Sequence, residues 1–110
     1  MTRKKRKGRI TPNGVILQNH EFATVVFFTD HGYDVELIPK SNIEGIHRPD
    51  VIINGLEWEM KAPKGEGKWL IPNTMKKAQQ QSENIIIDLR RVKLPQAKCI
   101  GHRLLYIGIS

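Results

Sequence analysis

Residues 49–61 read PDVIINGLEWEMK, and this stretch decides the fold. Asn54 and Gly55 form the dipeptide most typical of a two-residue β-hairpin, because a type I′ turn requires a positive φ at both central positions. Strand-like patterns flank the pair on both sides, with apolar and charged side chains alternating after it. The sequence therefore predicts a hairpin whose register places Asp50 directly opposite Glu59.

The predicted register places both carboxylates where one cation can bind them together. Cβ atoms of directly opposed residues lie about 4.5–5.5 Å apart, and opposed like charges are destabilising unless a positive charge lies between them. Mg²⁺ suits such a site, because it takes few carboxylates and keeps several waters and a substrate phosphate. Lys61 lies on the same predicted face as Glu59, where it would orient or deprotonate a bound water or stabilise developing charge. Asp50, Glu59 and Lys61 therefore predict a phosphodiester-hydrolysing centre.

A solvated strand surface is the alternative explanation for these charges, since exposed strands commonly carry Glu-x-Lys pairs. Glu57 fits this alternative best, as a solvent-facing residue or one that supports the metal ligands from outside. The opposite face of the second strand consists of Leu56, Trp58 and Met60. Trp58 and Trp69 are expected in the core, with stacking on a nucleic-acid base as the alternative for either ring.

Periodicity along the rest of the chain predicts helices and strands in turn. Asn19 is the expected N-cap of the first helix, and Ile43 and Ile46 are expected to fold inward from a loop. Residues 69–71 are expected to return to the core. The expected elements are a helix over 18–31 with a C-terminal glycine at position 32, a half-buried strand over 33–38, a polar loop over 39–48, a helix over 75–82, a buried strand over 84–89, a short helix over 95–101 and a last strand over 104–109.

Composition indicates one small cytoplasmic domain over residues 15–110. The chain has 110 residues and one cysteine, Cys99, so that an internal disulfide is excluded and the thiol is expected as a small core residue. No apolar run approaches the roughly 20 residues needed to span a bilayer, and no apolar segment follows the basic start as in a signal peptide. We therefore expect no membrane partner.

The net charge of +7 comes almost wholly from the N-terminus. Six basic residues lie between Arg3 and Arg9, and without them basic and acidic residues nearly balance. We expect residues 1–14 to form a flexible basic arm that ends in the turn residues 11–14. Such an arm either contacts nucleic-acid phosphates without sequence preference or is a solvated terminus, and the composition does not choose between the two.

Pro49-Asp50 followed by Glu59-Met60-Lys61 resembles the PD-(D/E)xK motif of the restriction-endonuclease-like nucleases. The order of predicted elements from residue 18 to residue 89 also resembles the core of that superfamily, which implies an α/β (α+β) fold with a small central mixed sheet flanked by helices. Within the superfamily the chain is most similar to the C-terminal nuclease domains of contact-dependent growth inhibition toxins, several of which cut tRNA. The similarity extends to Gly-Tyr-Asp-Val at 32–35 and Pro-Asp-Val-Ile at 49–52.

The resemblance implies a role for each matching residue. Asp50 and Glu59 would be metal ligands and Lys61 the catalytic lysine. Glu21 would complete the metal site or hold a ligated water, although a first-turn glutamate also complements the helix dipole without any further role. Contacts to substrate phosphates are implied for the second helix, with a solvated helix face as the alternative. The residues concerned are Lys76, Lys77 and Gln80.

The function implied by the resemblance is that of a metal-dependent nuclease, with Mg²⁺ as the expected cofactor and Mn²⁺ or Zn²⁺ as alternatives. Its expected partners are nucleic acid, tRNA before DNA, and an immunity protein. It would act in the cytoplasm, either as encoded or in a target bacterium. Independently of the resemblance, His47 lies next to Pro49-Asp50 and could approach the substrate, with a surface or capping histidine as the alternative. The alternative function is a non-catalytic nucleic-acid-binding module, in which the basic arm supplies the affinity and the hairpin acids form only a solvated face.

Overall fold

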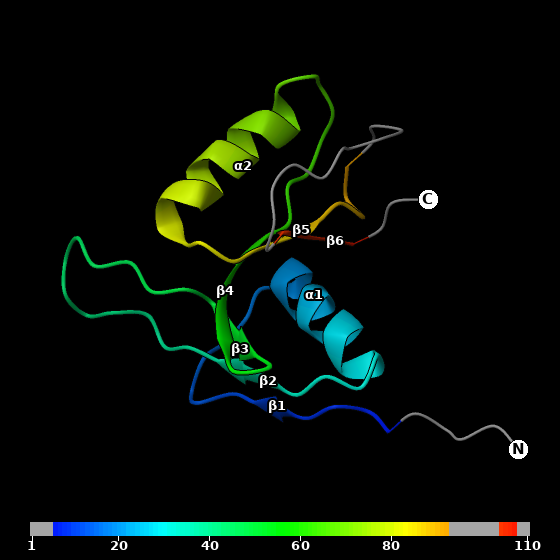
Figure 1. The fold of residues 1–110 in the computed structure, drawn as a ribbon, viewed down its shortest axis with the longest axis vertical. Coiled ribbons are helices and arrows are strands. Elements are labelled where there is room, and N and C mark those ends of the chain that lie inside the picture. The colour runs from blue at the N-terminus through cyan, green and yellow to red at the C-terminus, as the bar shows by residue number, and fades with distance from the viewer. Residues whose placement is uncertain (1–5, 93–103, 108–110) are drawn as a thin grey trace, which may run out of the picture.

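The computed structural model describes residues 6–92 and 104–107. The described residues form one mixed sheet whose six strands lie in the order of the sequence. The strand pairs β2–β3 and β3–β4 are antiparallel, whereas β1–β2, β4–β5 and β5–β6 are parallel. The expected α+β class, a small mixed sheet flanked by helices, is confirmed (Figure 1). The elements are β1 (Ile10–Thr11), α1 (Asn19–Asp30), β2 (Val35–Leu37), β3 (Val51–Ile53), β4 (Leu56–Lys61), α2 (Leu70–Gln81), β5 (Ile85–Asp88) and β6 (Leu104–Ile107).

The central hairpin forms as the sequence predicts. Asn54 has a φ of 54° and Gly55 a φ of 77°, which are the two positive values that a type I′ turn requires. Val51 pairs with Trp58 in β4. Trp58 is 9% exposed, and its indole N–H donates to the carbonyl of Ile53 at 3.3 Å. Both the register of β3 on β4 and the core position of Trp58 are therefore confirmed.

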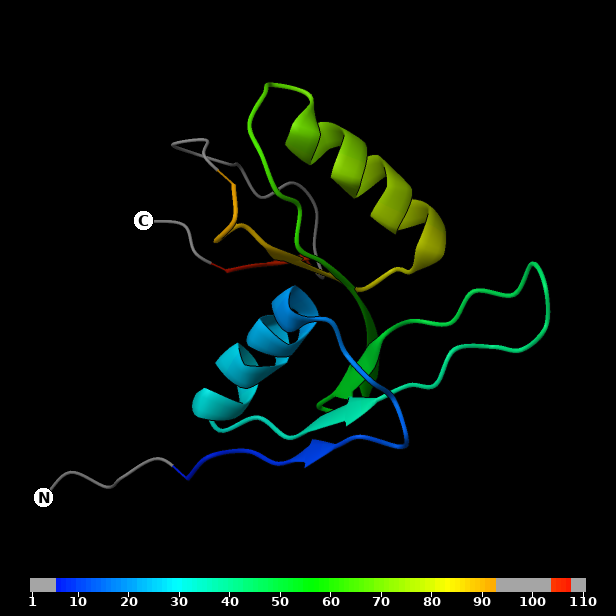
Figure 2. The same cartoon turned by 180° about the vertical axis from the view of Figure 1, so that it is seen from behind.

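The helices α1 and α2 cover opposite faces of the sheet, with β5 between them (Figures 1 and 2). Side chains of β5 alternate as a strand requires. Ile86 packs in the cluster that contains Val25 and Phe28 of α1, whereas Ile85 and Ile87 pack under α2. All four residues of β5 are buried, which confirms the predicted strand with two covered faces.

The ends of α1 lie within one residue of the predicted range. Its N-cap is Gln18 and not the expected Asn19, and the Gln18 N–H donates to Glu21 Oε1 at 2.9 Å. At the other end, Gly32 has a φ of 89° and its N–H donates to the carbonyl of Thr29 at 3.0 Å. This is part of a Schellman cap, in which the positive φ favours glycine. The expected C-terminal glycine is confirmed, and Glu21 is held in the first turn.

The helix α2 is longer than the sequence predicts, because it begins at residue 70 and not near residue 75. Pro72 is compatible with the earlier start, since a residue in the first turn has no intrahelical partner for its N–H. Ile71, Met75 and Ala78 are buried, whereas Trp69 is 64% exposed. The expectation that Trp69 belongs to the core is wrong, because the side chain precedes the helix and lies outside its buried face.

The N-terminal segment joins the sheet over part of its length. β1 pairs in parallel with β2, and the Gly8 N–H donates to the Thr29 carbonyl at 2.8 Å. The Arg9 N–H donates to Asp34 Oδ1 at 2.8 Å, and the Arg9 carbonyl accepts from the Val35 N–H at 2.9 Å. The expected flexible arm over residues 1–14 is therefore wrong for residues 8–11, because α1 and β2 pair their backbone groups.

The loop between β2 and β3 extends away from the sheet (Figure 1). Ile43 and Ile46, which were expected to fold inward, are 64% and 53% exposed. This expectation is wrong because the loop leaves the sheet and offers these side chains no apolar surface to cover. The loop does bring its last residues back to the start of β3, next to the hairpin.

The C-terminal part of the chain is described only over β6, which falls within the last predicted strand and pairs in parallel with β5. The expected short helix over 95–101 and the expected core position of Cys99 lie outside the described residues. Within the described ranges, no helix has both the length and the apolar character needed to cross a membrane.

Candidate active site

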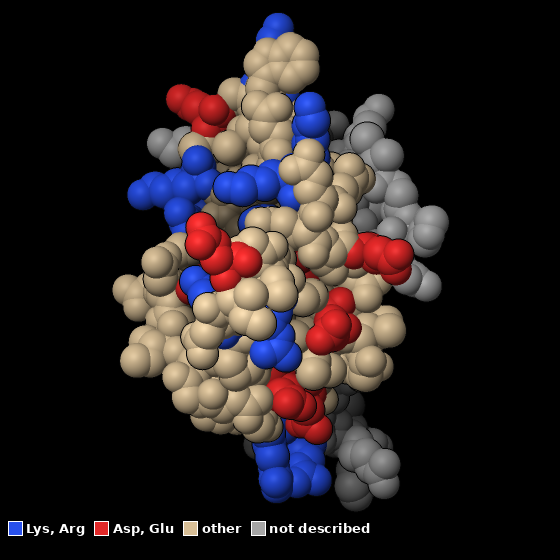
Figure 3. All heavy atoms as spheres, turned by 90° about the vertical axis from the view of Figure 1, so that its left-hand side faces the viewer, with Lys and Arg blue, Asp and Glu red and all other residues tan. Residues whose placement is uncertain are grey.

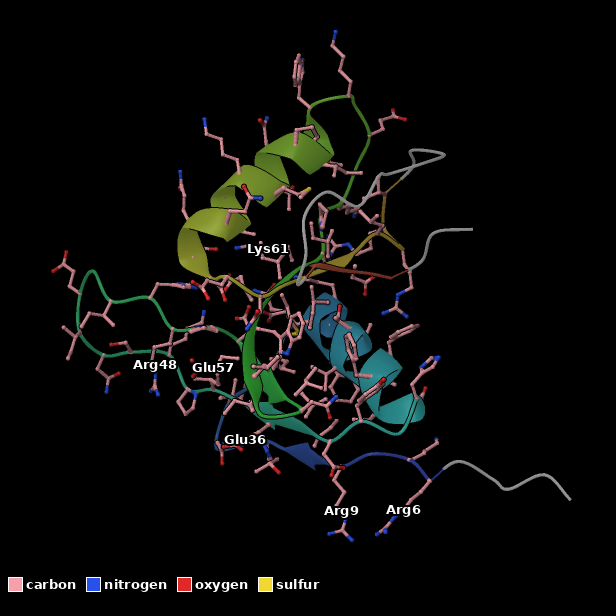
Figure 4. All side chains as sticks on the ribbon, in the orientation of Figure 1. Arg6, Arg9, Glu36, Arg48, Glu57 and Lys61 are labelled. Carbon is pink, nitrogen blue, oxygen red and sulfur yellow. The ribbon has the colours of Figure 1, made fainter. Side chains whose placement is uncertain are left out.

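All four residues that the resemblance selects line one cavity of about 450 Å³. Glu21 reaches it from the first turn of α1, Asp50 from the residue before β3, and Glu59 and Lys61 from β4. Figure 4 shows Lys61 on the part of the sheet that lies beneath α2. The fold therefore brings together side chains from three separate parts of the chain.

Glu59 is the most deeply buried acid of the cavity, at 2% exposure. Its strand, β4, lies between β3 and β5 and is covered on both edges. Glu59 Oε2 forms an ion pair with Lys61 Nζ at 3.1 Å, and Oε1 lies 2.8 Å from His47 Nε2. A buried carboxylate requires partners of this kind, and here each oxygen has one.

Asp50 lies one residue before the paired part of β3, and its side chain reaches across to β4. The ladder of cross-strand pairs ends at Val51 and Trp58. The Asp50 N–H donates to the Trp58 carbonyl at 2.9 Å, while Asp50 Oδ2 accepts from the Met60 N–H at 2.8 Å. The predicted direct opposition of Asp50 and Glu59 is thus replaced by hydrogen bonds to the residues on either side of Glu59.

The pKa of Asp50 is raised to about 6, chiefly by burial and then by the negative charges of Glu59 and Glu21. The hydrogen bond from Met60 and the positive charge of Lys61 oppose this rise. Neighbouring carboxylates disfavour the ionised form of one another, and a cation placed among them would reverse that effect. The electrostatics of the cavity therefore favour a positively charged ligand.

Glu21 caps the N-terminus of α1 and also lines the cavity. Its Oε1 accepts the Gln18 N–H at the start of α1, where a negative charge also complements the helix dipole. The same carboxylate lines the cavity and contributes to the raised pKa of Asp50. The capping bond uses Oε1 and leaves Oε2 for other contacts.

His47 is a residue of the cavity that the motif does not contain. Its Nε2 lies 2.8 Å from Glu59 Oε1, and 43% of its side chain is exposed. The available signal in the sequence was its position two residues before Pro49. That position does not specify a contact with β4, which arises only when the loop returns beside the folded hairpin.

The α2 residues expected at substrate phosphates do not reach the cavity. Its lining, as far as the chain is described, contains no residue of α2. Lys76, Lys77 and Gln80 are exposed, and Figure 3 shows Lys and Arg side chains gathered over this helix. The three residues therefore belong to a surface next to the cavity and not to its wall.

The donor set suits a hard divalent cation, which prefers carboxylate oxygens and keeps water ligands. Asp50 and Glu59 are the side chains that could hold it directly. Over residues 6–92, no three or more His, Cys, Asp and Glu side chains are grouped as a metal site. Water or substrate would complete the coordination of a cation held by Asp50 and Glu59 at this cavity.

Comparison with known protein families gives an independent match to this region. A family model for the contact-dependent growth inhibition CdiA C-terminal domain matches residues 47–104. The match covers more than half of the chain and includes His47, Asp50, Glu59 and Lys61, but it does not include Glu21. No curated protein and no solved structure matches the chain. The chain therefore belongs to the family of CdiA C-terminal toxin domains of contact-dependent growth inhibition.

Proposed function

We propose that this domain is a metal-dependent nuclease of the PD-(D/E)xK type, which hydrolyses phosphodiester bonds of nucleic acid. The observation that carries the proposal is that Asp50, Glu59 and Lys61 of the motif line a single cavity together with Glu21 of α1. Family membership supports it, because a growth-inhibition toxin requires a reaction that harms the target cell. The preferred substrate is tRNA, with DNA as the second candidate, and an immunity protein is the proposed protein partner.

Each residue of the cavity has a distinct part in this proposal. Mg²⁺, when bound, would polarise the scissile phosphate and lower the pKa of a bound water. Asp50 and Glu59 would supply the carboxylate oxygens that hold the cation. Lys61, which is fixed 3.1 Å from Glu59, places a positive charge where negative charge develops on the phosphate oxygens. Glu21 positions a water through the oxygen that its capping bond leaves unused.

The burial of Glu59 strengthens these interactions. Charges interact more strongly where the effective dielectric constant is low, and Glu59 is only 2% exposed. A divalent cation bound by Asp50 and Glu59 would compete with the contact between Glu59 and His47. His47 would then be released toward the cavity, where its partly exposed ring can contact the substrate.

The test compares the purified domain with three variants on total RNA and on plasmid DNA, with Mg²⁺, with Mn²⁺ and with EDTA. Asp50→Asn and Lys61→Ala should each lower the cleavage rate by at least about 100-fold, the usual effect of losing one preorganised charge at a reacting centre. Glu57→Gln is the matched control, because Glu57 is an exposed residue of the same strand. Its cleavage rate should equal that of the wild type.

Circular dichroism of each variant shows whether the fold survives the substitution. Equal cleavage by the wild type, Asp50→Asn and Lys61→Ala would refute the nuclease proposal. Salt-sensitive binding of nucleic acid without cleavage, in the presence of either cation, would instead establish the non-catalytic binding module. Cleavage of only one of the two substrates decides between RNA and DNA.

A further inference from the structure

A row of side chains on the outward side of α2 begins with an exposed tryptophan at the N-cap position of the helix. We call this row the stripe. Side chains that follow at intervals of three or four residues lie on one side of a helix. All members of the stripe are exposed, whereas the buried residues of α2 face β5. From its first to its last residue, the stripe consists of Trp69, Asn73, Lys76 and Gln80.

The surroundings of this stripe are strongly basic. Residues 61–81 contain five lysines and a single acid, Glu66, and none of the residues of α2 is acidic. In Figure 3, Lys and Arg side chains gather over α2, beside a hollow in the surface. A face with this charge attracts phosphates and holds them through salt-sensitive contacts.

The stripe and Lys61 lie on the same side of the sheet. Lys61 pairs in register with Ile87 of β5, and paired residues of neighbouring strands point to the same face. Ile87 packs in the cluster beneath α2, and Figure 4 shows Lys61 below that helix. A strand of nucleic acid that passes Lys61 on this side therefore meets α2.

Trp69 gives the basic surface an aromatic ring on which a base can stack. The ring is 64% exposed, and Lys68 Nζ lies 5.4 Å from its centroid. Stacking of bases on aromatic side chains, combined with cations that follow the backbone, is how proteins bind single strands without sequence preference. A base within a duplex is already stacked and paired, so it gains little from such a ring.

We propose that α2 and Trp69 bind a single-stranded segment of the substrate, with one unpaired base stacked on Trp69 and the adjoining phosphates on the lysines of α2. The inference rests on the proposed function and deepens it, because it defines the substrate as nucleic acid with an unpaired segment beside the cleavage site.

The test measures binding in EDTA, so that it does not depend on cleavage. A fluorescently labelled single-stranded oligonucleotide of about ten nucleotides, in an RNA and a DNA version, and the corresponding duplexes are titrated with the protein. Trp69→Leu should weaken binding of the single strands on the order of tenfold, the usual loss for one stacked base. Trp69→Phe should restore most of the affinity, because it keeps an aromatic ring.

Further measurements separate stacking from general charge. Tyr33→Leu is the matched control, since Tyr33 is an aromatic residue that is 43% exposed and packs on Phe28 of α1, and the affinity of this variant should be unchanged. Replacing Lys76 and Lys77 by Gln should weaken single strands and duplexes alike and lower the salt dependence. Quenching of tryptophan fluorescence by the single strand should disappear in Trp69→Leu.

Unchanged single-strand affinity in Trp69→Leu, or an equal loss for the duplexes, would overturn the inference. Sedimentation that shows a dimer dependent on Trp69 would assign the ring to a second copy of the chain and would overturn it as well. Trp69-dependent binding by a protein that cleaves neither RNA nor DNA would refute the proposed function and leave this inference standing.

Discussion

Asp50 keeps a proton at pH values where an isolated aspartate has lost it, because burial and the charges of Glu59 and Glu21 raise its pKa to about 6. In the unfolded chain the ordinary value of 3.8 applies. As the pH rises from 3.8 to about 6, the unfolded state releases this proton before the folded state does, so the free energy of unfolding decreases. About one unit above pH 6 the folded state has released the proton as well, so the loss of stability is complete and no longer changes with pH.

Replacing the ionisable group should remove this cost. In EDTA at pH 8, Asp50→Asn should be more stable than the wild type by on the order of 2 kcal/mol, because the neutral amide still accepts the Met60 N–H and carries no buried charge. The difference should shrink as the pH approaches 4. Urea unfolding at both pH values measures it, and a difference that does not depend on pH would contradict the assigned cause.

At the scale of elements, an ion pair at the end of β5 joins this strand to α1. Asp88 is 3% exposed, and it accepts hydrogen bonds from Thr24 Oγ1 at 2.7 Å and from Arg90 Nε at 2.9 Å. The Arg90 guanidinium also donates to the carbonyl of Ala23 in α1 at 3.0 Å. Burial alone would raise the pKa of Asp88, but the bonds from Arg90 and Thr24 outweigh it and lower the pKa.

Removing the cation of this pair should destabilise the protein strongly. Arg90→Ala leaves a buried carboxylate with one side-chain partner, and about 3 kcal/mol of stability should be lost at pH 7. The lowered pKa of Asp88 stabilises the fold only at pH values above that pKa. The difference in the free energy of unfolding between variant and wild type should therefore decrease as the solution is acidified through that pKa. Chemical unfolding across pH provides the measurement.

The exposed ion pair between Lys7 and Asp30, with 3.6 Å between Nζ and Oδ1, is the matched comparison. Both of its side chains are largely solvated, so Lys7→Ala should cost less than about 1 kcal/mol. Similar losses in Lys7→Ala and Arg90→Ala would show that the link between α1 and β5 contributes little to stability.

At the scale of the whole molecule, basic side chains of the described residues gather on two surfaces that belong to different elements. One is the lysine surface of α2 (Figure 3). The other lies beside β1, where Arg6 and Arg9 line a cavity of about 320 Å³ together with Asp34. Figure 4 shows both arginines on the same edge of the molecule. Since residues 8–11 are hydrogen-bonded to the body, the charge of Arg9 is presented from a fixed position.

The double variant Arg6→Gln/Arg9→Gln tests what this second surface contributes. If both arginines contact phosphates, the slope of log affinity against log salt should become less negative by up to about 2 for nucleic acid. Cleavage at saturating substrate should not change, because neither residue lines the cavity of the motif residues. An unchanged slope, measured by fluorescence anisotropy at several salt concentrations, would assign these charges to a solvated surface only.

The sequence by itself determined the features that depend on a few neighbouring residues. Asn54-Gly55 specifies the turn through two positive φ values, and the turn sets the register of β3 on β4. Gly32 ends α1 for the same reason, and the run of isoleucines in β5 indicates a strand covered on both faces. These signals are local, because backbone sterics and side-chain alternation act over short distances along the chain.

Only the tertiary structure decided which of these local elements meet. Glu21 reaches Asp50 because α1 packs against the hairpin, and His47 reaches Glu59 because a long loop returns beside β4. The pairing of β1 with β2 and the exposure of Trp69 were missed in the same way. Such contacts join residues far apart in the chain, and their stability comes from packing and backbone pairing that no short stretch of sequence contains.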